Sequence, residues 1–361
     1  MNIVKATRKY EEWLRRHVRI VDPDLQLKHE RMAEAIFPFF RATFYRWLQL
    51  WPDGCGELDD VPHILSVGDL HVENFGTWRD VDGRLVWGVN DFDEAYAYPY
   101  TNDLVRLATS ASLAAREQHL HMDPKRSAAA ILEGYENGMA EGGRPFVLEE
   151  DHAWLREIAE GKLRDPVLFW QKVDRLPTVR GTISESAREA IEHMLPQSGL
   201  RYRLARRVAG LGSLGRVRLV AIAEWNGGRI AREAKALTGS ALHWLHPELA
   251  PAEILYSAIL KRAVRCPDPF VQMRSHWIVR RLSPHCSRIE LQALGNSKSE
   301  LRLLQAMGRE TANIHAGTAE KRNAILKDLR RRKKTWLAKA AQIMAQKVEK
   351  DWKDWRERRR N

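Results

Sequence analysis

Apolar residues recur along the chain at spacings that predict helices near both ends, with two separate groups of strands between them. Residues 3–19 place Tyr10 and Leu14 near one face of a helix, and residues 27–50 form a second helical stretch that contains Pro38. Further helical patterns cover residues 104–140 with a break near Met122, then residues 252–261, residues 299–315 and the tail from residue 321. This pattern indicates a helix-rich α+β fold.

The first group of strands is a hairpin. Residues 75–79 and 85–89 are apolar and rich in β-forming residues, and Asp82-Gly83 between them is a turn signal. Because a hairpin reverses the chain, we expect it to bring Asn74, before the first strand, beside Asp91, after the second.

Polar residues around this hairpin fall where phosphoryl transfer needs them. Asp69 and Asn74 are five apart, which suits a short loop that carries an acceptor for a substrate proton and an amide oxygen for Mg²⁺. Asp91 adds a carboxylate oxygen, which Mg²⁺ prefers. A purely structural role as turn-forming residues is the alternative.

The second group of strands surrounds a glycine-rich loop. A strand-like run at residues 203–209 leads into Gly210-Leu-Gly212-Ser213-Leu-Gly215, and a β-prone run at 217–222 follows. A dinucleotide-binding loop of this pattern opens a helix, whereas a glycine loop between two strands is typical of a cover over nucleotide phosphates. Gly210, Gly212, Ser213 and Gly215 are therefore candidate nucleotide-binding residues.

The block Gly68-Asp69-Leu70-His71-x-x-Asn74, followed by Asp91-Phe92-Asp93, resembles the catalytic loop and metal motif of the aminoglycoside-phosphotransferase branch of the protein-kinase-like superfamily. The resemblance implies that the Asp69–His71 motif is catalytic, with Asp69 as the catalytic aspartate. It further implies that Asn74 and Asp91 hold Mg²⁺ and that ATP is the donor. Asp93 replaces the glycine of the Asp-Phe-Gly motif and is an additional candidate metal ligand.

Two neighbouring positions bear on this resemblance. Asp103, in Asn102-Asp103-Leu104, resembles an aspartate that begins a helix and braces the catalytic loop in that branch. Val67 departs from the pattern, because that branch usually has His there.

Residues Gly68–Gly76 and Asn90–Glu94 are similar to the characteristic blocks of bacterial domain-of-unknown-function family 2252, which is assigned to the same superfamily. The resemblance covers most of the chain, roughly residues 28–318. Its opening segment includes Arg41, for which a phosphate contact and a position at the rim of the aromatic core are alternatives.

The resemblance also extends to the strands after the glycine loop. It implies that Lys235, on a third strand at 229–235, contacts the nucleotide phosphates. We expect Glu253, on the helix predicted at 252–261, to pair with Lys235. The helix propensity of residues 232–237 leaves a solvated helical lysine as the alternative. Strands at 270–273 and 277–282 are expected to complete this part of the chain.

The order of these parts is unusual, because kinases ordinarily have the glycine loop and lysine before the catalytic aspartate. The resemblance therefore implies a two-lobed, circularly permuted kinase-like fold, which packing permits when the original termini lie close together. Residues 1–200 are predicted to hold N-terminal helices and the catalytic part of the large lobe. Residues 201–285 would form a β-rich small lobe, and residues 286–361 the C-terminal helices with a basic tail.

Composition adds constraints on location and partners. The 361 residues contain no signal-peptide core near the N-terminus and no apolar run approaching the ~18 residues of a membrane span. The three cysteines lack the paired spacing of a disulfide framework or zinc site, so a reducing cytoplasm is expected. Most of the net charge of +12 lies in residues 321–361, which hold 16 Lys or Arg against 5 Asp or Glu. This tail predicts a helix docked on the body, with an anionic partner such as RNA or an acidic membrane surface as the alternative.

These observations predict a Mg²⁺- and ATP-dependent kinase that transfers the γ-phosphoryl group to an unidentified small-molecule or protein hydroxyl. Residues 104–200 are expected to build the acceptor pocket, and transfer of AMP instead of phosphoryl stays open. Two alternatives remain: a metal-dependent phosphoesterase using Asp69, His71 and Asp91, and a non-catalytic module that binds nucleotide.

Overall fold

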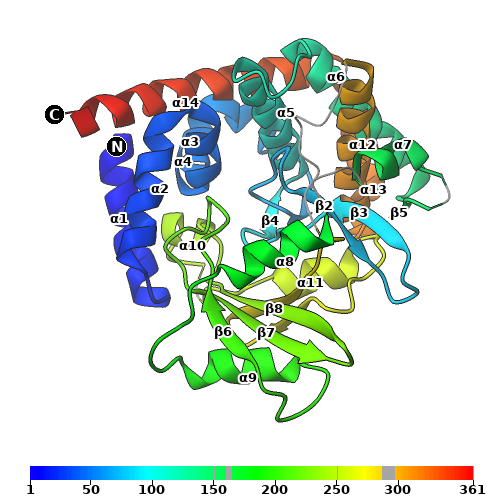
Figure 1. The fold of residues 1–361 in the computed structure, drawn as a ribbon. Helices are drawn as coiled ribbons and strands as arrows, with labels where there is room; N and C mark the ends of the chain where they lie inside the picture. Colours follow the sequence, from blue (N-terminus) through cyan, green and yellow to red (C-terminus); the bar gives the residue numbers. More distant parts are fainter. Residues whose placement is uncertain (150, 160–164, 250, 287–296, 361) are drawn as a thin grey trace.

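A five-stranded antiparallel sheet and a larger helical body make up the molecule (Figure 1). The computed structural model describes residues 1–149, 151–159, 165–249, 251–286 and 297–360. The fold is mixed α+β, as predicted. Residues 160–164, within the segment expected to build the acceptor pocket, and residues 287–296, which open the predicted C-terminal part, lie outside the described residues.

The N-terminal quarter is helical, with breaks that follow backbone chemistry. The stretch predicted at 27–50 is divided among three helices, because the backbone is extended at Ala35 and leaves the helical region at Thr43. Pro38 lies in the first turn of a helix, where its missing N–H removes no hydrogen bond. These helices are α1 (Ile3–His17), α2 (Asp22–Glu34), α3 (Ile36–Ala42) and α4 (Phe44–Cys55), followed by the short 3-10 helix η1 (Gly56–Leu58).

The predicted hairpin is confirmed, and it pairs the expected residues. β2 (Phe75–Arg79) runs antiparallel to β3 (Leu85–Val89), and Phe75 lies opposite Val89. Gly83 adopts a φ of 77° in the turn, a conformation that favours glycine. The amide of Asn90 donates to the carbonyl of Asn74 at 2.9 Å, so the two ends of the hairpin meet as expected. The other strands of this region are β1 (His63–Ser66), which pairs with β4 (Tyr96–Pro99), and β5 (Phe146–Val147), which pairs with β3.

The five-stranded sheet carries the glycine loop between its first two strands. Its strand order is β6 (Arg203–Arg206), β7 (Arg218–Trp225), β8 (Gly228–Ala236), β10 (Trp277–Leu282) and β9 (Gln272–Arg274). Lys235 lies in β8, opposite Arg218 of β7 and Ile278 of β10. The strand prediction for Lys235 is therefore confirmed and the helical alternative is wrong, because pairing on both sides outweighs the local helix propensity.

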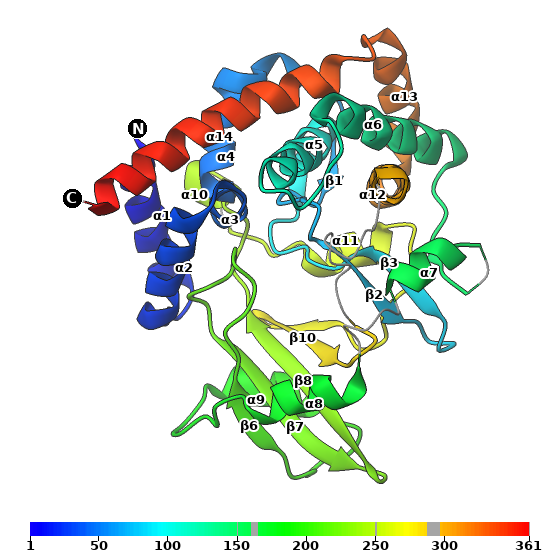
Figure 2. The same cartoon turned by 45° about the horizontal axis from the view of Figure 1, so that its top comes forward.

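Alternation along the strands separates the two faces of this sheet. Val220 and Ile222 contact Val173 of α8 (Pro166–Asp174), while the opposite face is covered by α9 (Glu185–His193). Arg218, Glu233 and Lys235 share the face that carries α8, since they follow the same alternation. Figure 2 shows this sheet below the helical body.

Two glycines set the distance between the main helices of the body. A Cβ at Gly134 of α6 (Pro124–Glu141) would collide with the carbonyl of Gln305, and one at Gly308 with the carbonyl of Ile131. These glycines therefore allow α6 to pack closely against α12 (Ser297–His315). The predicted break near Met122 separates α6 from α5 (Tyr100–Arg116), and the remaining helices are α7 (Ala153–Ala159), α10 (Leu242–Leu245), α11 (Tyr256–Arg262), η4 (Ala319–Lys321) and α13 (Arg322–Arg331).

The basic tail ends in α14 (Trp336–Arg360), which crosses the helical body in Figure 1 and packs against α5 and α4. Leu337, Met344 and Val348 of its apolar stripe are buried. An ion pair between Asp351 and Arg46, at 2.6 Å, ties the helix to α4. The predicted docking on the body is confirmed, whereas an anionic partner stays a prediction. No helix within the described parts of the chain is long and apolar enough to cross a membrane.

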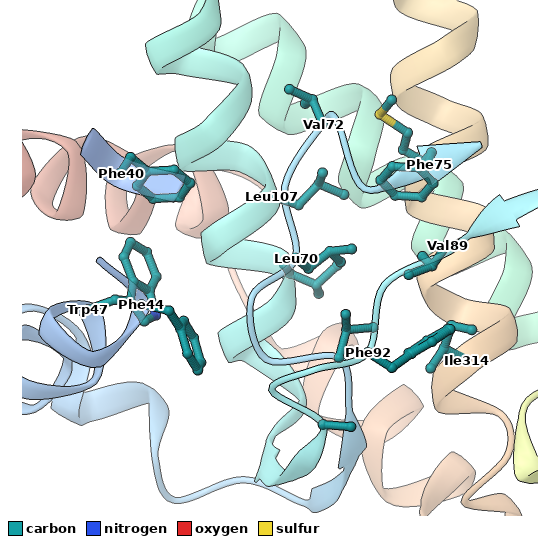
Figure 3. Packing of buried hydrophobic residues seen from close by; sticks show 14 of the residues in the cluster. Phe40, Phe44, Trp47, Leu70, Val72, Phe75, Val89, Phe92, Leu107 and Ile314 are labelled. Carbon is teal, nitrogen blue, oxygen red and sulfur yellow. The ribbon is translucent and has the colours of Figure 1, made fainter. Parts of the chain in front are cut away.

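The segments that carry Asp69 and Asp91 rest on apolar side chains. Leu70 and Phe92 are almost completely buried, and Figure 3 shows them between α5, which contributes Leu107, and α12, which contributes Ile314. This packing holds the polar residues on either side of Leu70 and Phe92 in place.

Glu310 of α12 supports the end of the hairpin, and its protonation is expected to make the unfolding free energy depend on pH. Its carboxylate accepts from the amide of Val89 at 3.1 Å and from Asn313 at 2.8 Å. Burial raises the pKa of Glu310 to about 7, although Arg265 acts to lower it. The unfolded chain releases this proton near pH 4.5, so the folded state binds more protons between these values and loses stability as the pH rises.

We expect Glu310→Gln to remove this contribution. From pH 5 to pH 8 the wild type should lose about 2 kcal/mol of unfolding free energy relative to the variant, measured by urea unfolding. Glu320→Gln, at an exposed position, is the control and should give no such change. An equal pH slope in Glu310→Gln and wild type would contradict this role.

Candidate active site

The loop that carries Asp69 is held by Asp103, as the sequence predicts. The carboxylate of Asp103, in the first turn of α5, accepts from the amides of Val67 at 2.8 Å and Gly68 at 2.9 Å. His315 contacts the same carboxylate through Nε2 at 3.1 Å, and its Nδ1 meets the hydroxyl of Tyr135 at 2.9 Å. His315 is thus a buried structural residue that links α12 to the catalytic loop.

Asp69 is fixed by a cation that the sequence interpretation missed. Its Oδ1 accepts from Nε of Arg106 at 2.8 Å and also from Nη2. Arg106 is fully buried, and its guanidinium lies 4.1 Å from the ring of Phe40, 4.8 Å from Phe44 and 5.0 Å from Trp47. Burial raises the pKa of Asp69, and Arg106 opposes this by stabilising the carboxylate. Arg106 lies in an apolar helix three residues after Asp103, and a charged residue at such a position is the signal that could have identified it.

The glycine loop lies directly over Asp69. A Cβ at Gly212 would be 3.6 Å from Oδ2 of Asp69 and 3.2 Å from the carbonyl of Arg41, so the space above the carboxylate is narrow. Gly210 and Gly215 have φ values of 75° and 97°, which require glycine-like freedom. Ser213 stabilises the loop by donating to Gly210 at 3.3 Å. The structure therefore brings together the glycine loop and the aspartate, which are far apart in sequence.

Asn74 and Asp91 line the same space beside Asp69. The amide nitrogen of Asn74 donates to the carbonyl of Asp69 at 2.6 Å, which directs its Oδ1 away from that contact. The side chain of Asp91 is 35% exposed to solvent. Burial acts to raise the pKa of Asp91, but the charge of Lys235, a hydrogen bond with Asp93 and the nearby arginines together outweigh it, so the pKa lies well below its usual value. Both residues offer the hard oxygen atoms that Mg²⁺ prefers.

Lys235 reaches the metal motif from the sheet. Its Nζ lies 2.6 Å from Asp93 and 3.3 Å from Asp91. Asp93 also forms an ion pair with Arg216 at 3.5 Å, while burial and the charge of Asp91 raise the pKa of Asp93. The predicted Glu253 pair is wrong: Glu253 is exposed in the segment before α11, and the ion pairs of Lys235 go to Asp91 and Asp93.

Three arginines surround one buried glutamate beside Lys235. Glu233 accepts from Arg218 at 2.8 Å, from Arg280 at 2.9 Å and also from Arg207. Burial acts to raise the pKa of Glu233, but the three cations hold it well below the usual value. One carboxylate only partly neutralises three guanidinium groups, so this group leaves positive charge beside the candidate metal ligands. The sequence interpretation missed it, because its members come from separate strands and a loop.

A cleft of about 1160 Å³ extends from Asn74 and Asp91 along the sheet. Arg207, Arg218 and Arg280 line it, and so do Leu282, Ser283 and Pro284 at the end of β10. The cleft is large enough for a nucleotide, and its volume lies just above the usual range of roughly 300–1,000 Å³ for small-molecule sites.

His71 and Arg41 flank the small space around Asp69. The ring of His71 meets Phe37 edge-on at 6.4 Å, and its Nδ1 accepts from the amide of Glu73 at 3.2 Å. Arg41 pairs with Glu73 at 2.5 Å and is largely buried. These contacts show that both residues shape the catalytic loop; the catalytic role of His71 stays a prediction.

The donor set around Asp91 fits Mg²⁺ better than a metal held by protein alone. Among the residues with described positions, no group of three or more His, Cys, Asp or Glu side chains is placed to hold a metal ion. Mg²⁺ commonly uses one or two protein ligands and takes the rest from substrate phosphates and water. Asn74 and Asp91 supply such a pair.

The Arg106–Asp69 pair gives a testable energetic prediction. Arg106→Gln should leave a mostly buried carboxylate without its cation and lower the unfolding free energy by about 3 kcal/mol. Adding Asp69→Asn should recover part of this loss, measured by urea unfolding as a double-mutant cycle. The control Arg116→Gln removes the exposed pair with Glu349 and should cost less than about 1 kcal/mol. Equal costs for the two arginines would contradict the assignment.

Comparison with known proteins finds a family match over the segment that carries Asp69 and Asp91. Residues 19–168 match the model of a family described as "Uncharacterized protein conserved in bacteria (DUF2252)". The match includes Asp69, Asn74, Asp91 and Asp93, and ends before the glycine loop. Searches of curated proteins and of solved structures returned no match. Over residues 19–168 the family match thus supports the relationship predicted from the Gly68–Gly76 and Asn90–Glu94 blocks.

Proposed function

We propose that the protein is a Mg²⁺-dependent phosphotransferase that takes the γ-phosphoryl group from ATP. The observation that carries the proposal is the position of Gly212 over Asp69, at the point where the large cleft reaches Asn74 and Asp91. A phosphate-covering loop, a proton acceptor and two metal-type oxygens thereby meet at one end of a nucleotide-sized cleft. Such a site works by positioning and charge stabilisation.

Asp69 is the proton acceptor in this proposal. Oδ1 of Asp69 accepts from Arg106, whereas Oδ2 faces the glycine loop. Oδ2 is therefore the oxygen directed toward the space where an acceptor hydroxyl would lie. The fixed orientation of the carboxylate lowers the reorganisation needed when the hydroxyl approaches.

Asn74 and Asp91 would hold Mg²⁺, which when bound supplies positive charge to the donor phosphates. Lys235 keeps Asp91 ionised and so maintains it as a ligand. Arg218 and Arg280, on the sheet face of the cleft, would hold the remaining phosphates.

A two-lobed, circularly permuted kinase-like fold is part of the same proposal. Two features support it: a glycine loop between β6 and β7, and Lys235 on the next strand directed at the metal motif. A glycine-rich loop and a lysine on the third strand are the corresponding parts of protein kinases. Here they follow Asp69 in the chain.

The alternatives receive less support from the contacts. A phosphoesterase would use His71 beside Asp69 as a metal ligand, but Nδ1 of His71 accepts from the backbone of its own loop. Only a turnover measurement distinguishes a non-catalytic nucleotide-binding module from an enzyme.

Nucleotide binding is the first test. Calorimetric titration of MgATP into the wild type should give saturable binding that weakens when Mg²⁺ is chelated. Asp91→Ala should lower the affinity at least about tenfold, because a charged ligand contact contributes about 1.5–3 kcal/mol. Asp82→Asn, in the exposed hairpin turn, is the control and should bind as the wild type does. Absence of wild-type binding at millimolar ATP would refute the proposal.

Turnover is the second test. Asp69→Asn should bind MgATP within about threefold of the wild type, because Asp69 is not a proposed nucleotide contact. Release of labelled phosphate from γ-labelled ATP, with water as the acceptor, should fall by about 10²-fold or more through loss of the proton acceptor. A wild type that binds MgATP with no release would identify the non-catalytic module.

A further inference from the structure

A small pocket of about 50 Å³ lies beside the glycine loop, next to Asp69. Lys28 of α2 and Arg216, which follows the loop, line it together with Gly212 and the carboxylates of Asp69, Asp91, Asp93 and Glu94. A site for one water needs roughly 10–15 Å³, so the pocket has room for several waters or for one small oxyanion. Neither Lys28 nor Arg216 was singled out by the sequence.

Lys28 presents a buried ammonium to this pocket. Only 4% of the residue is exposed, and its Nζ donates to the carbonyl of Gly212 at 3.0 Å. An ammonium carries three donors, so this bond uses one of them. Burial lowers the pKa of Lys28 to about 8, with Glu11, Asp69 and Glu94 acting to raise it and Arg216 to lower it. Lys28 is therefore mainly charged at neutral pH.

Arg216 adds a second buried cation. Its side chain is 5% exposed and lies 3.5 Å from Asp93 and 3.8 Å from Glu94. The 3.5 Å contact joins Nη1 to Asp93 as an ion pair, but this nitrogen makes no hydrogen bond within the described parts of the molecule. A buried guanidinium nitrogen that makes no hydrogen bond is costly, which makes it a candidate to donate to a ligand.

Loop attachment by itself does not explain a lysine at position 28. The amide of Val21 already donates to the carbonyl of Gly215 at 2.7 Å, and Leu25 packs beside Gly215. A neutral donor would satisfy the Gly212 carbonyl without the cost of burying a charge. The charge therefore needs an explanation beyond holding the loop.

We propose that Lys28 and Arg216 form an oxyanion subsite facing Asp69, which holds the phosphoryl group that the enzyme transfers. The inference rests on the proposed function for the identity of that group, since an anionic group of the acceptor has the same chemistry. In either case the N-terminal helix α2 contributes Lys28 to the site, beside the residues that come from the glycine loop and the sheet.

The test compares MgATP, MgADP and inorganic phosphate as titrants in calorimetry. Lys28→Gln retains an amide donor for the Gly212 carbonyl and removes the charge. We expect about tenfold weaker MgATP binding, with MgADP binding changed less than about twofold, because only ATP carries the transferred group. Arg31→Gln, at an exposed position on the same helix, is the matched control and should change neither affinity.

Inorganic phosphate separates the two sources of the oxyanion. If the subsite holds the γ-phosphoryl group, millimolar phosphate should weaken wild-type binding of MgATP and leave MgADP unaffected, a result that does not depend on any variant. If it holds an acceptor anion, phosphate should bind beside MgATP and lose affinity in Lys28→Gln. Lys28→Met, which retains the aliphatic stem, is a second neutral variant, and thermal unfolding checks that each variant is folded.

The outcomes also separate this inference from the proposed function. Lys28-dependent phosphate binding without any nucleotide binding would support the subsite and refute the phosphotransferase. If each of the three titrants binds the wild type and both Lys28 variants with unchanged affinity, and nucleotide binding is seen, the subsite is refuted. The phosphotransferase proposal then stands.

Discussion

The buried ion pair between Arg106 and Asp69 is the interaction on which the organisation of the site depends. Arg106 lies against three aromatic rings of α3 and α4, so the N-terminal helices determine where its guanidinium sits. Because the pair fixes one carboxylate oxygen, the other faces the glycine loop. Removing a charge from water is costly, and the aromatic faces and the paired carboxylate together offset that cost.

The remaining charges follow from the same constraint. Asp91 and Asp93 lie close together, and their mutual repulsion is relieved by Lys235 and Arg216. The sheet adds three arginines around Glu233. In the proposed function, phosphate oxygens and Mg²⁺ would pair with the cations and carboxylates that now pair with one another.

The glycine loop is also held on its outer side. Val21 and Lys28 bond to its carbonyls, and Asp24 pairs with Arg206 at its base. The loop therefore cannot lift without moving α2. This attachment makes the N-terminal helices part of the site, next to the large cleft that reaches Asn74 and Asp91.

The sequence by itself determined the hairpin and the glycine loop, because turn residues and alternation are local signals, whereas it left a helical alternative for Lys235 that only the pairing of β8 on both sides excluded. It also identified Asp69, Asn74 and Asp91, which lie within one short segment. Only the tertiary structure decided their partners: Arg106, Lys28 and the arginines around Glu233 are brought in by packing of distant elements, and Glu253 was paired wrongly for the same reason. Local patterns fix which residues are on a strand or loop, whereas the pairing of buried charges depends on how helices and sheet fit together.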